Sequence, residues 1–161
     1  MINLTDKIEE IKKQEYWAEY LEDYSHDGAY ICDAVTNCAD DNVDIYNYEL
    51  YKYLSENPET VEETINEYGW EGCGGTLLKA TQMAQFRDFE NQMYDSLPQI
   101  LEYLVLKKLK TLGVEYITEN QYNNVLDCCK DVDVDKTFEE FIEETTVNAF
   151  GKEFMEELNN D

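Results

Sequence analysis

Arginine and histidine are almost absent from this sequence, and their scarcity excludes several kinds of site. The 161 residues include 12 Lys and Arg against 37 Asp and Glu, for a net charge of −25. Arg87 is the only arginine, so one side chain at most can clamp a phosphate or carboxylate through two parallel hydrogen bonds. His26 is the only histidine and stands in a Ser-His-Asp-Gly turn, where a nucleophile-and-base pair cannot be assembled from the usual parts. We predict that the protein is not an enzyme and has no catalytic residues.

Long apolar runs, secretory signals and paired cysteines are also missing. No apolar run approaches the length of a membrane span, and residues 1–13 lack the basic-then-apolar layout of a secretory signal. The five cysteines are odd in number and have no Cys-x-x-Cys spacing, which indicates reduced thiols. The adjacent Cys128 and Cys129 have no neighbours that would complete a four-ligand metal site. These absences predict a cytoplasmic protein without cofactor, metal or membrane partner.

The acidic residues are concentrated in two parts of the chain. Residues 14–71 carry a net charge of −15 and residues 114–161 a net charge of −11, whereas residues 77–113 carry +1. A compact protein with this imbalance repels nucleic acid and anionic lipid, and it attracts cationic surfaces. The most common large cationic surfaces in a cell bind DNA or RNA. We therefore expect the partner to be a protein with a basic nucleic-acid-binding cleft, with no direct contact to nucleic acid.

Apolar residues recur at helical spacing, and no convincing run alternates with period two, so the sequence predicts an all-α multi-helix bundle. Thr5 is expected to cap a first helix that runs past Glu15, and a second helix is expected to turn Tyr30, Ile31, Ala34, Val35 and Cys38 inward. An Asp/Asn turn is expected at residues 40–44. Further helices are expected near residues 45–54, 60–68, 76–94, 97–112, 119–129, 138–150 and 152–158.

The expected helix near 97–112 is apolar on most sides, which predicts burial at the centre of the fold or partly in a subunit interface. Gly113 should end it, before a short extended piece at 114–117. We expect a helical core domain over 1–113, with 114–161 as an acidic helical C-terminal subdomain or an extension of that domain. Capping boxes are expected at Thr60/Glu63, Ser96/Gln99, Thr118/Gln121 and Thr137/Glu140.

Two motifs look like ligand sites but lack essential residues. The loop with Gly69, Gly72, Gly74 and Gly75 lacks the Lys-Ser/Thr ending of a phosphate-binding loop, so turn formation explains it better. Residues 131–135 carry acids at the first, third and fifth positions of a would-be calcium loop. However, Lys136 stands where glycine must turn the chain and Ile142 where the bidentate glutamate must lie. A solvated acidic linker is the better interpretation.

Acidic residues three and four apart form rows, because these spacings place side chains on one helix face about 5–6 Å apart. Such like-charge pairs each cost a helix a few tenths of a kcal/mol, so folding alone does not favour them. Duplex DNA carries one charge per roughly 1.7 Å of axis, so the net charge matches about 40 Å of duplex. A merely soluble or salt-adapted surface is the alternative, but neither explains the segregation. The rows are Glu15, Glu19, Glu22 and Asp23; Glu59, Glu62, Glu63 and Glu67; and Glu139, Glu140, Glu143 and Glu144.

Residues 33–50, about a ninth of the chain, include Asp33-Ala34-Val35, Ala39-Asp40, Val43, Tyr46, Glu49 and Leu50. Through these residues the stretch resembles, without a gap, the Ocr-like phage anti-restriction proteins. Asp44 stands where that family has a proline, and residues 114–161 have no clear counterpart. The resemblance implies an all-α dimer that imitates bent B-form DNA and occupies the DNA groove of restriction–modification enzymes. It also implies that Asp33, Asp40 and Glu49 occupy phosphate-mimicking positions.

Together these observations predict an acidic DNA mimic of phage or mobile-element type that inhibits a host defence enzyme of restriction–modification or CRISPR type. The alternative is an acidic adaptor that binds a basic protein without imitating a duplex, and a metal-dependent enzyme ranks third. Tyr46, Tyr48, Tyr51 and Tyr53 are expected to supply contact area or core packing. The candidate phosphate-mimicking residues are Glu15, Glu19, Glu22, Asp23, Asp27, Asp33, Asp40, Asp41, Asp44, Glu49, Glu59, Glu62, Glu63, Glu67, Glu139, Glu140, Glu143 and Glu144.

Overall fold

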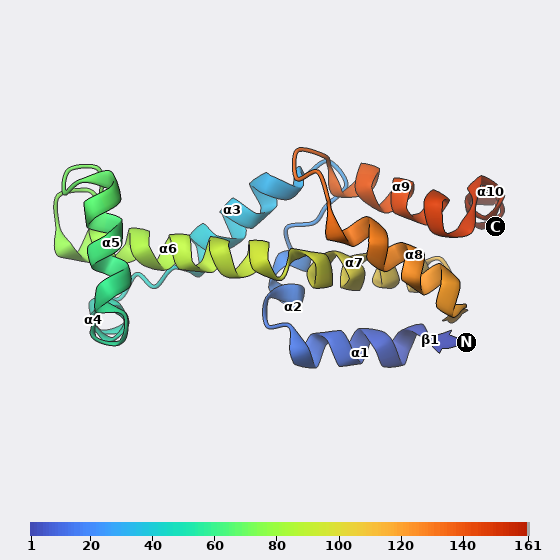
Figure 1. Cartoon of the computed structure of the whole chain (residues 1–161), viewed down its shortest axis with the longest axis horizontal. Coiled ribbons are helices and arrows are strands. Elements are labelled where there is room, and N and C mark those ends of the chain that lie inside the picture. The colour runs from blue at the N-terminus through green and yellow to red at the C-terminus, as the bar shows by residue number, and fades with distance from the viewer. Residues whose placement is uncertain (161) are drawn as a thin grey trace. The chain divides into compact units, whose positions relative to one another are not determined.

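The computed structural model describes residues 1–160, with the side chains of 1–154, 156 and 157. Helices dominate this part of the chain, and the only sheet within it has two short strands, so the all-α prediction is confirmed (Figure 1). The elements are β1 (Ile2–Asn3), α1 (Leu4–Gln14), α2 (Trp17–Glu22), α3 (Ile31–Asn42), α4 (Asn47–Glu56), α5 (Pro58–Tyr68), α6 (Leu77–Asp95), α7 (Leu97–Thr111), β2 (Tyr116–Ile117), α8 (Glu119–Lys130), α9 (Phe138–Phe150) and α10 (Lys152–Asn160). Among residues 1–160, no helix combines the length and the apolar character that crossing a bilayer requires.

The chain divides into two compact units, and the division differs from the expected one. The larger unit comprises Met1–Val35 and Met93–Asp161, and the smaller unit comprises Thr36–Gln92. The boundary expected after Gly113 therefore falls inside the larger unit. Helices α3 and α6 each contain one of the observed boundaries. An all-helical pattern gives no composition shift at these points, which is why the sequence did not indicate them.

The core of the larger unit is built around α7. The side chains of Ile100, Leu101, Val105, Leu106 and Leu109 are fully buried. Helix α1 lies on one side of α7, α8 and α9 lie on the other, and α2 also packs against it (Figure 1). Burying each such aliphatic side chain contributes about 1.5–3 kcal/mol. The prediction of a buried helix at the centre of the fold is thus confirmed, since elements of the same chain cover it.

The smaller unit has a core of smaller side chains. Its largest fully buried aliphatic residue is Leu50 of α4, joined by Val61 of α5. Helices α4 and α5 pack against each other as a hairpin. The remaining buried apolar residues of this unit are Cys38, Ala39, Cys73, Ala80 and Ala84. Since small residues bury little area, this unit draws less stabilisation per residue from its interior than the larger unit does.

The N-terminal helix prediction is wrong in two respects. Asn3, and not Thr5, caps α1: its side-chain Oδ1 accepts a hydrogen bond from the Asp6 N–H at 2.9 Å. The chain then leaves the helix at Glu15, with φ −120° and ψ 105°. The single helix expected here is therefore divided into α1 and α2. Glu15 is buried at 8% exposure, and its Oε1 accepts a hydrogen bond from the backbone N–H of Trp17 at 3.2 Å.

The connection between α3 and α4 also differs from the prediction. Residues 40–42, expected in a turn, form the last turn of α3, and the connection is residues 43–46. Asp44 is held there by Gln85 of α6: its N–H donates to Gln85 Oε1 at 2.8 Å, and Gln85 Nε2 donates to Asp44 Oδ2 at 2.9 Å. A tertiary contact thus determines where the chain turns. Ile45, expected at the start of the next helix, lies in this connection and is exposed. Tyr30, expected to face inward, is also exposed.

Two of the four expected caps are present. Thr118 and Gln121 form both hydrogen bonds of a capping box, and Thr137 Oγ1 accepts from the Glu140 N–H at 3.1 Å. The boxes at Thr60 and Ser96 are absent: α5 begins at Pro58, so Thr60 lies inside it, and Ser96 makes no side-chain cap. A proline in the first turn presets the helical φ, so α5 and α7 begin without a side-chain cap. Val114–Ile117 includes the expected extended piece, because Tyr116 and Ile117 pair with Asn3 and Ile2.

Candidate partner-binding surface

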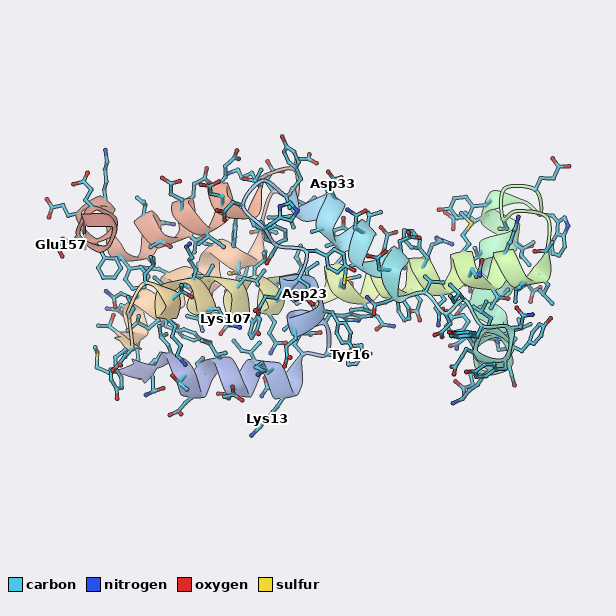
Figure 2. The ribbon with its side chains drawn as sticks, turned by 180° about the vertical axis from the view of Figure 1, so that it is seen from behind. Lys13, Tyr16, Asp23, Asp33, Lys107 and Glu157 are labelled. Carbon is cyan, nitrogen blue, oxygen red and sulfur yellow. The ribbon has the colours of Figure 1, made fainter. Side chains whose placement is uncertain are left out.

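The clearest acidic row lies on α9 in the larger unit. Helix α9 buries Phe138, Phe141 and Ala149 against its neighbours, so its opposite face is left to water. Figure 2 shows oxygen-tipped side chains projecting outward along this helix. The two acids in its first turn are favoured by the helix dipole, which partly offsets their mutual repulsion. The exposed members of the row are Glu139, Glu140, Glu143 and Glu144.

One cation lies at the end of this row. Lys136 Nζ forms an ion pair with Glu144 Oε2 at 2.6 Å, and this contact raises the pKa of Lys136. None of the ion pairs formed by residues 1–160 includes Glu139, Glu140 or Glu143. The structure also brings Asp27 into the same place, since it lines one groove together with Glu139, Glu143 and one cation, Lys108. The α9 row thus gains a member from the turn after α2.

A second row lies on α5 in the smaller unit. Val61 and Thr64 face the interior, and Glu59, Glu62 and Glu63 are exposed. The fourth member, Glu67, forms an ion pair through Oε2 with Arg87 NH2 of α6 at 2.7 Å. The other three enter no ion pair among the described residues. Each unit therefore presents one row of three unpaired carboxylates on a continuous helix.

The expected row Glu15, Glu19, Glu22 and Asp23 does not form as a row. Glu15 is buried where the helix breaks, so its spacing to the others no longer places it on their face. Glu22 Oε1 pairs with Lys107 Nζ at 2.8 Å, and Glu19 Oε1 pairs with Lys12 Nζ at 3.5 Å. Asp23 remains exposed. The helix break and two lysines from α1 and α7 thus convert this expected row into a locally balanced cluster.

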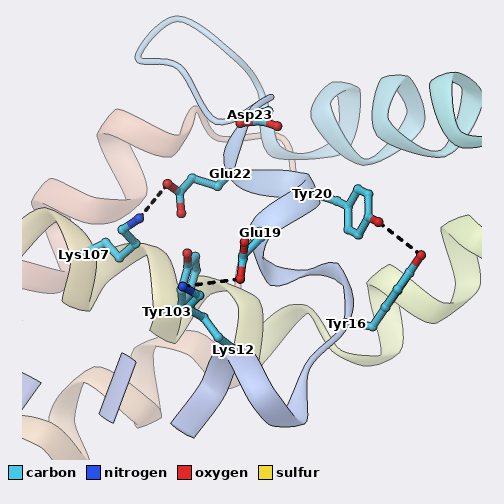
Figure 3. Close-up of a pocket in the computed structure, with 8 residues that line it drawn as sticks. All are labelled: Lys12, Tyr16, Glu19, Tyr20, Glu22, Asp23, Tyr103 and Lys107. Atoms are coloured by element: carbon cyan, nitrogen blue, oxygen red, sulfur yellow. Dashed lines mark hydrogen bonds and ion pairs between the residues drawn. The ribbon is translucent and has the colours of Figure 1, made fainter. Parts of the chain in front are cut away.

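This cluster lines a groove of mixed charge (Figure 3). Lys12 pairs with Glu19, Lys107 pairs with Glu22, and Asp23 adds a third carboxylate, so the groove has a net charge of only −1. Tyr103 lies at its base, where burial raises the pKa of its hydroxyl and the Glu22 carboxylate raises it further. The hydroxyls of Tyr16 and Tyr20 meet at 3.4 Å at its edge. Because its charges are largely compensated, this groove is a poor candidate for capturing a basic surface.

The five candidates in residues 33–49 differ in exposure. Asp33, Asp40 and Asp41 of α3 are exposed, whereas Asp44 and Glu49 are half-buried. Asp44 is held by Gln85, as described above, so only part of its carboxylate faces water. Two of the three positions that the resemblance marked as phosphate-mimicking, Asp33 and Asp40, are therefore accessible.

The structure separates the tyrosines of residues 46–53 into two sets. Tyr53 faces inward beside the buried Leu50, and its hydroxyl donates to Asp88 Oδ2 at 3.5 Å. Burial, together with that carboxylate, raises the pKa of Tyr53 to about 12. Tyr46, Tyr48 and Tyr51 are 61%, 69% and 56% exposed. The sequence left both roles open for these four residues. The spacing from Leu50 indicates an inward Tyr53 but also an inward Tyr46, and Tyr46 is exposed because it is the extended N-cap residue before α4.

A buried carboxyl that the sequence did not indicate lies between α7 and α8. Glu102 of α7 is buried, and the hydroxyl of Tyr122 donates a hydrogen bond to its Oε1. Burial raises the pKa of Glu102, although the hydrogen bond from Tyr122 and the charge of Lys7 oppose the shift. Lys7 Nζ lies 5.0 Å above the Tyr122 ring. This group is internal and stabilises the contact of α7 with α8, so it does not belong to the exposed rows.

Within residues 1–160, the acidic, cysteine and histidine side chains form no group of three that could hold a metal ion. Asp131, Asp133 and Asp135 act locally instead: Asp133 Oδ1 accepts a hydrogen bond from the Asp135 N–H at 3.0 Å, which is a turn contact. Comparisons of the chain with family models, with curated proteins and with solved structures find no match.

Proposed function

We propose that this protein is an acidic DNA mimic that acts in the cytoplasm of a bacterial host and inhibits a DNA-binding defence enzyme by occupying its DNA-binding cleft. The observation that carries the proposal is the pair of rows on α5 and α9, in each of which three exposed carboxylates form no ion pair among the described residues and the fourth is paired. Each row sits on a helix whose opposite face is buried, so its carboxylates are presented outward at fixed spacing. The proposal includes restriction–modification and CRISPR enzymes as targets, since both hold DNA in basic clefts.

The rows are energetically unfavourable for folding, which supports a role in binding. Three unpaired glutamates on one face weaken a helix by a few tenths of a kcal/mol for each neighbouring pair. The chain has cations that could have relieved this, as Lys107 does for Glu22. Among the described residues none of them forms an ion pair with Glu62, Glu63, Glu140 or Glu143, and the nearest approaches are the charge of Lys136 acting on Glu140 and Lys108 lining a groove with Glu143. The repulsion between these carboxylates is relieved when a cationic partner binds, so the rows favour binding at the expense of helix stability.

The mechanism is competition through charge. Carboxylates three and four residues apart on a helix lie about 5–6 Å apart, so a basic cleft that holds a phosphate backbone can hold them too. The whole-molecule charge of −25 steers the encounter and raises the association rate. The carboxylate rows imitate phosphates and no base edges. The mimic therefore competes for the part of the cleft that binds the DNA backbone. Binding should therefore weaken steeply as salt is added.

Affinity capture tests the proposal directly. The full chain is immobilised and exposed to a bacterial lysate at low salt, and bound proteins are eluted with duplex DNA. The expected result is recovery of a DNA-binding enzyme whose activity the soluble protein inhibits in a salt-dependent way. If duplex DNA displaces none of the bound proteins, mimicry is contradicted.

A matched pair of variants assigns the effect to the rows. Glu→Gln at Glu139, Glu140 and Glu143 removes three charges from α9, and Glu→Gln at Glu115, Glu119 and Glu153 removes three exposed charges elsewhere in the larger unit. The first variant should inhibit the captured enzyme more weakly than the second. Equal inhibition by the two variants would mean that total charge matters and the row does not.

The adaptor function remains the competing proposal, and the exposed tyrosines of α4 favour it, because tyrosine is enriched in protein interfaces. An adaptor can bind its basic partner while that partner holds DNA. Sedimentation of the captured partner with the protein and a fluorescent duplex separates the two functions: a ternary complex supports the adaptor, and mutual exclusion supports the mimic.

A further inference from the structure

An aromatic surface lies on α4, the helix that packs against α5 of the smaller unit, and the proposed function does not account for it. We call it the tyrosine face of α4; it is formed by Tyr48 and Tyr51 of the helix and by Tyr46, the N-cap residue before it. All three rings are more than half exposed, and the rings of Tyr46 and Tyr48 stack with centroids 5.9 Å apart and planes inclined by 25°. Leu50 is buried in the interior, and Tyr48, two positions before it, lies on the opposite side of the helix. The packing of α4 therefore holds the Tyr48 ring outside, and the ring of Tyr46 stacks on it from the residue before the helix.

The charges around this face are almost all negative. The α4–α5 hairpin, residues 47–68, carries six glutamates and one lysine, Lys52. The smaller unit as a whole has 12 acidic and three basic side chains, a net charge of −9. A second copy of this chain, with net charge −25, would be repelled by such a surface. The surface is complementary to a cationic protein that also offers flat groups to cover the rings.

The same unit contains an internal example of that chemistry. The guanidinium carbon of Arg87 lies 4.8 Å from the centroid of the Tyr68 ring, and Arg87 NH2 also pairs with Glu67 Oε2 at 2.7 Å. One arginine thus stacks on a tyrosine and pairs with the neighbouring glutamate. The dipeptide Tyr48-Glu49 offers the same two groups on α4, with the ring exposed and no arginine above it among the described residues.

We propose that the tyrosine face of α4 binds arginine side chains of the partner protein, which stack on Tyr46, Tyr48 and Tyr51 while the glutamates of the α4–α5 hairpin pair with their guanidinium groups. The inference rests on the proposed function insofar as the partner is basic, and it adds which cation that partner presents. Arginine suits this face because its guanidinium is planar, weakly hydrated and able to stack and hydrogen-bond at once, whereas the lysine ammonium is compact and strongly hydrated. An aromatic–cation contact at an exposed site corresponds to about a two- to five-fold change in affinity.

The test compares two peptides of equal charge. Fluorescently labelled deca-arginine and deca-lysine are titrated with the full chain at physiological salt, and anisotropy gives the two dissociation constants. The unmodified protein should bind deca-arginine more tightly, by about two- to five-fold for each ring engaged. Equal affinity for the two peptides would overturn the proposal, because carboxylates alone attract both.

Three variants locate the preference. The triple variant Tyr46→Leu, Tyr48→Leu and Tyr51→Leu keeps apolar bulk but removes the rings, so the arginine preference should fall to near one while deca-lysine affinity stays the same. The triple Phe variant at the same positions keeps the rings and should keep the preference. The control, Tyr16→Leu, Tyr30→Leu and Tyr116→Leu, removes three exposed tyrosines of the larger unit and should also keep it. A preference that persists in the α4 Leu variant, or that is lost in the control, would assign arginine binding to another surface.

The outcomes of this test and of the test of the proposed function are separable. Circular dichroism first confirms that each variant keeps its helix content, which is expected because all the substituted side chains are exposed. If the arginine preference is found but duplex DNA never competes for the captured partner, mimicry fails and the tyrosine face stands. If duplex DNA competes but the peptides bind equally, the tyrosine face fails and mimicry stands.

Discussion

Residues 15–23 and α9 both carry acids three and four residues apart, yet the structure gives them opposite environments. In residues 15–23 the helix breaks at Glu15, and Lys12 and Lys107 approach the carboxylates that remain. On α9 the helix is continuous, and Glu140 and Glu143 are left without ion pairs among the described residues. Spacing therefore produces an anionic row only where the helix persists and most of its carboxylates form no ion pair. The first set of acids serves the fold, and the second set is available to a partner.

The largest expected effect separates these two sets through binding. Replacing Glu59, Glu62, Glu63, Glu139, Glu140 and Glu143 by Gln removes six exposed charges. At about 0.2–1 kcal/mol for each exposed contact, affinity for a deca-lysine peptide should fall by about ten-fold or more. Fluorescence anisotropy measures the loss. The matched control replaces Glu9, Glu10, Glu19, Glu115, Glu119 and Glu153, which lie outside both rows, and a loss as large in that variant would remove the distinction.

For stability, in contrast to binding, an acid of residues 15–23 should matter more than an acid of the exposed rows. Glu15→Ala removes the buried carboxylate that accepts the Trp17 N–H, so the free energy of unfolding should fall by about 1–2 kcal/mol, whereas affinity for deca-lysine should not change. Urea unfolding followed by circular dichroism measures the loss. Glu63→Ala on the exposed face of α5 is the control and should shift the stability by less than about 0.5 kcal/mol. A loss no greater than that of the control would show that the Glu15 contact does not stabilise the α1–α2 junction.

The buried Glu102 extends the comparison to pH. Burial raises its pKa in the folded protein above the ordinary value of 4.5, so the folded state favours the protonated carboxyl. This contribution to stability is complete below about pH 4.5 and is lost as the pH rises through the raised value. Glu102→Gln cannot ionise and still accepts from Tyr122, so its stability relative to the unmodified protein should increase with pH above 4.5.

Unfolding in urea at a series of pH values measures that difference, which cancels the titration of the other carboxylates. Glu139→Gln is the control, because its carboxylate is exposed. A stability difference for Glu102→Gln that stays constant across this pH range would mean that the pKa of Glu102 is the same in the folded and the unfolded protein.

The smallest expected effect comes from removing a cation from the cluster of residues 15–23. Lys107→Gln removes the partner of Glu22, and since both side chains are about a third or more exposed, the stability loss should not exceed about 1 kcal/mol. The groove would then resemble α9 more closely, because Glu22 would be unpaired beside Asp23. Affinity for deca-lysine should rise slightly, and a fall would show that Lys107 does not neutralise this cluster. Lys13→Gln, which removes an exposed lysine outside the pairs described here, controls for the change in net charge.

The parts of the fold that local chemistry controls were predictable. Apolar residues on most sides of α7 indicated its burial, and Thr118 with Gln121 indicated the start of α8. Gly113, with φ at 96°, ends the segment as expected, because glycine adopts that conformation without strain. The α5 and α9 rows were equally visible, since residues three and four apart share a face of any continuous helix.

The sequence alone thus determined that this protein is helical, which helix lies at its centre, and that its charge is strongly negative and segregated. These properties depend on residues within one or two turns of each other. Only the tertiary structure decided which acids are exposed, because Lys107 meets Glu22 across 85 positions and Gln85 meets Asp44 across 41. Such contacts depend on how helices pack, and the spacing within one helix carries no information about what lies opposite.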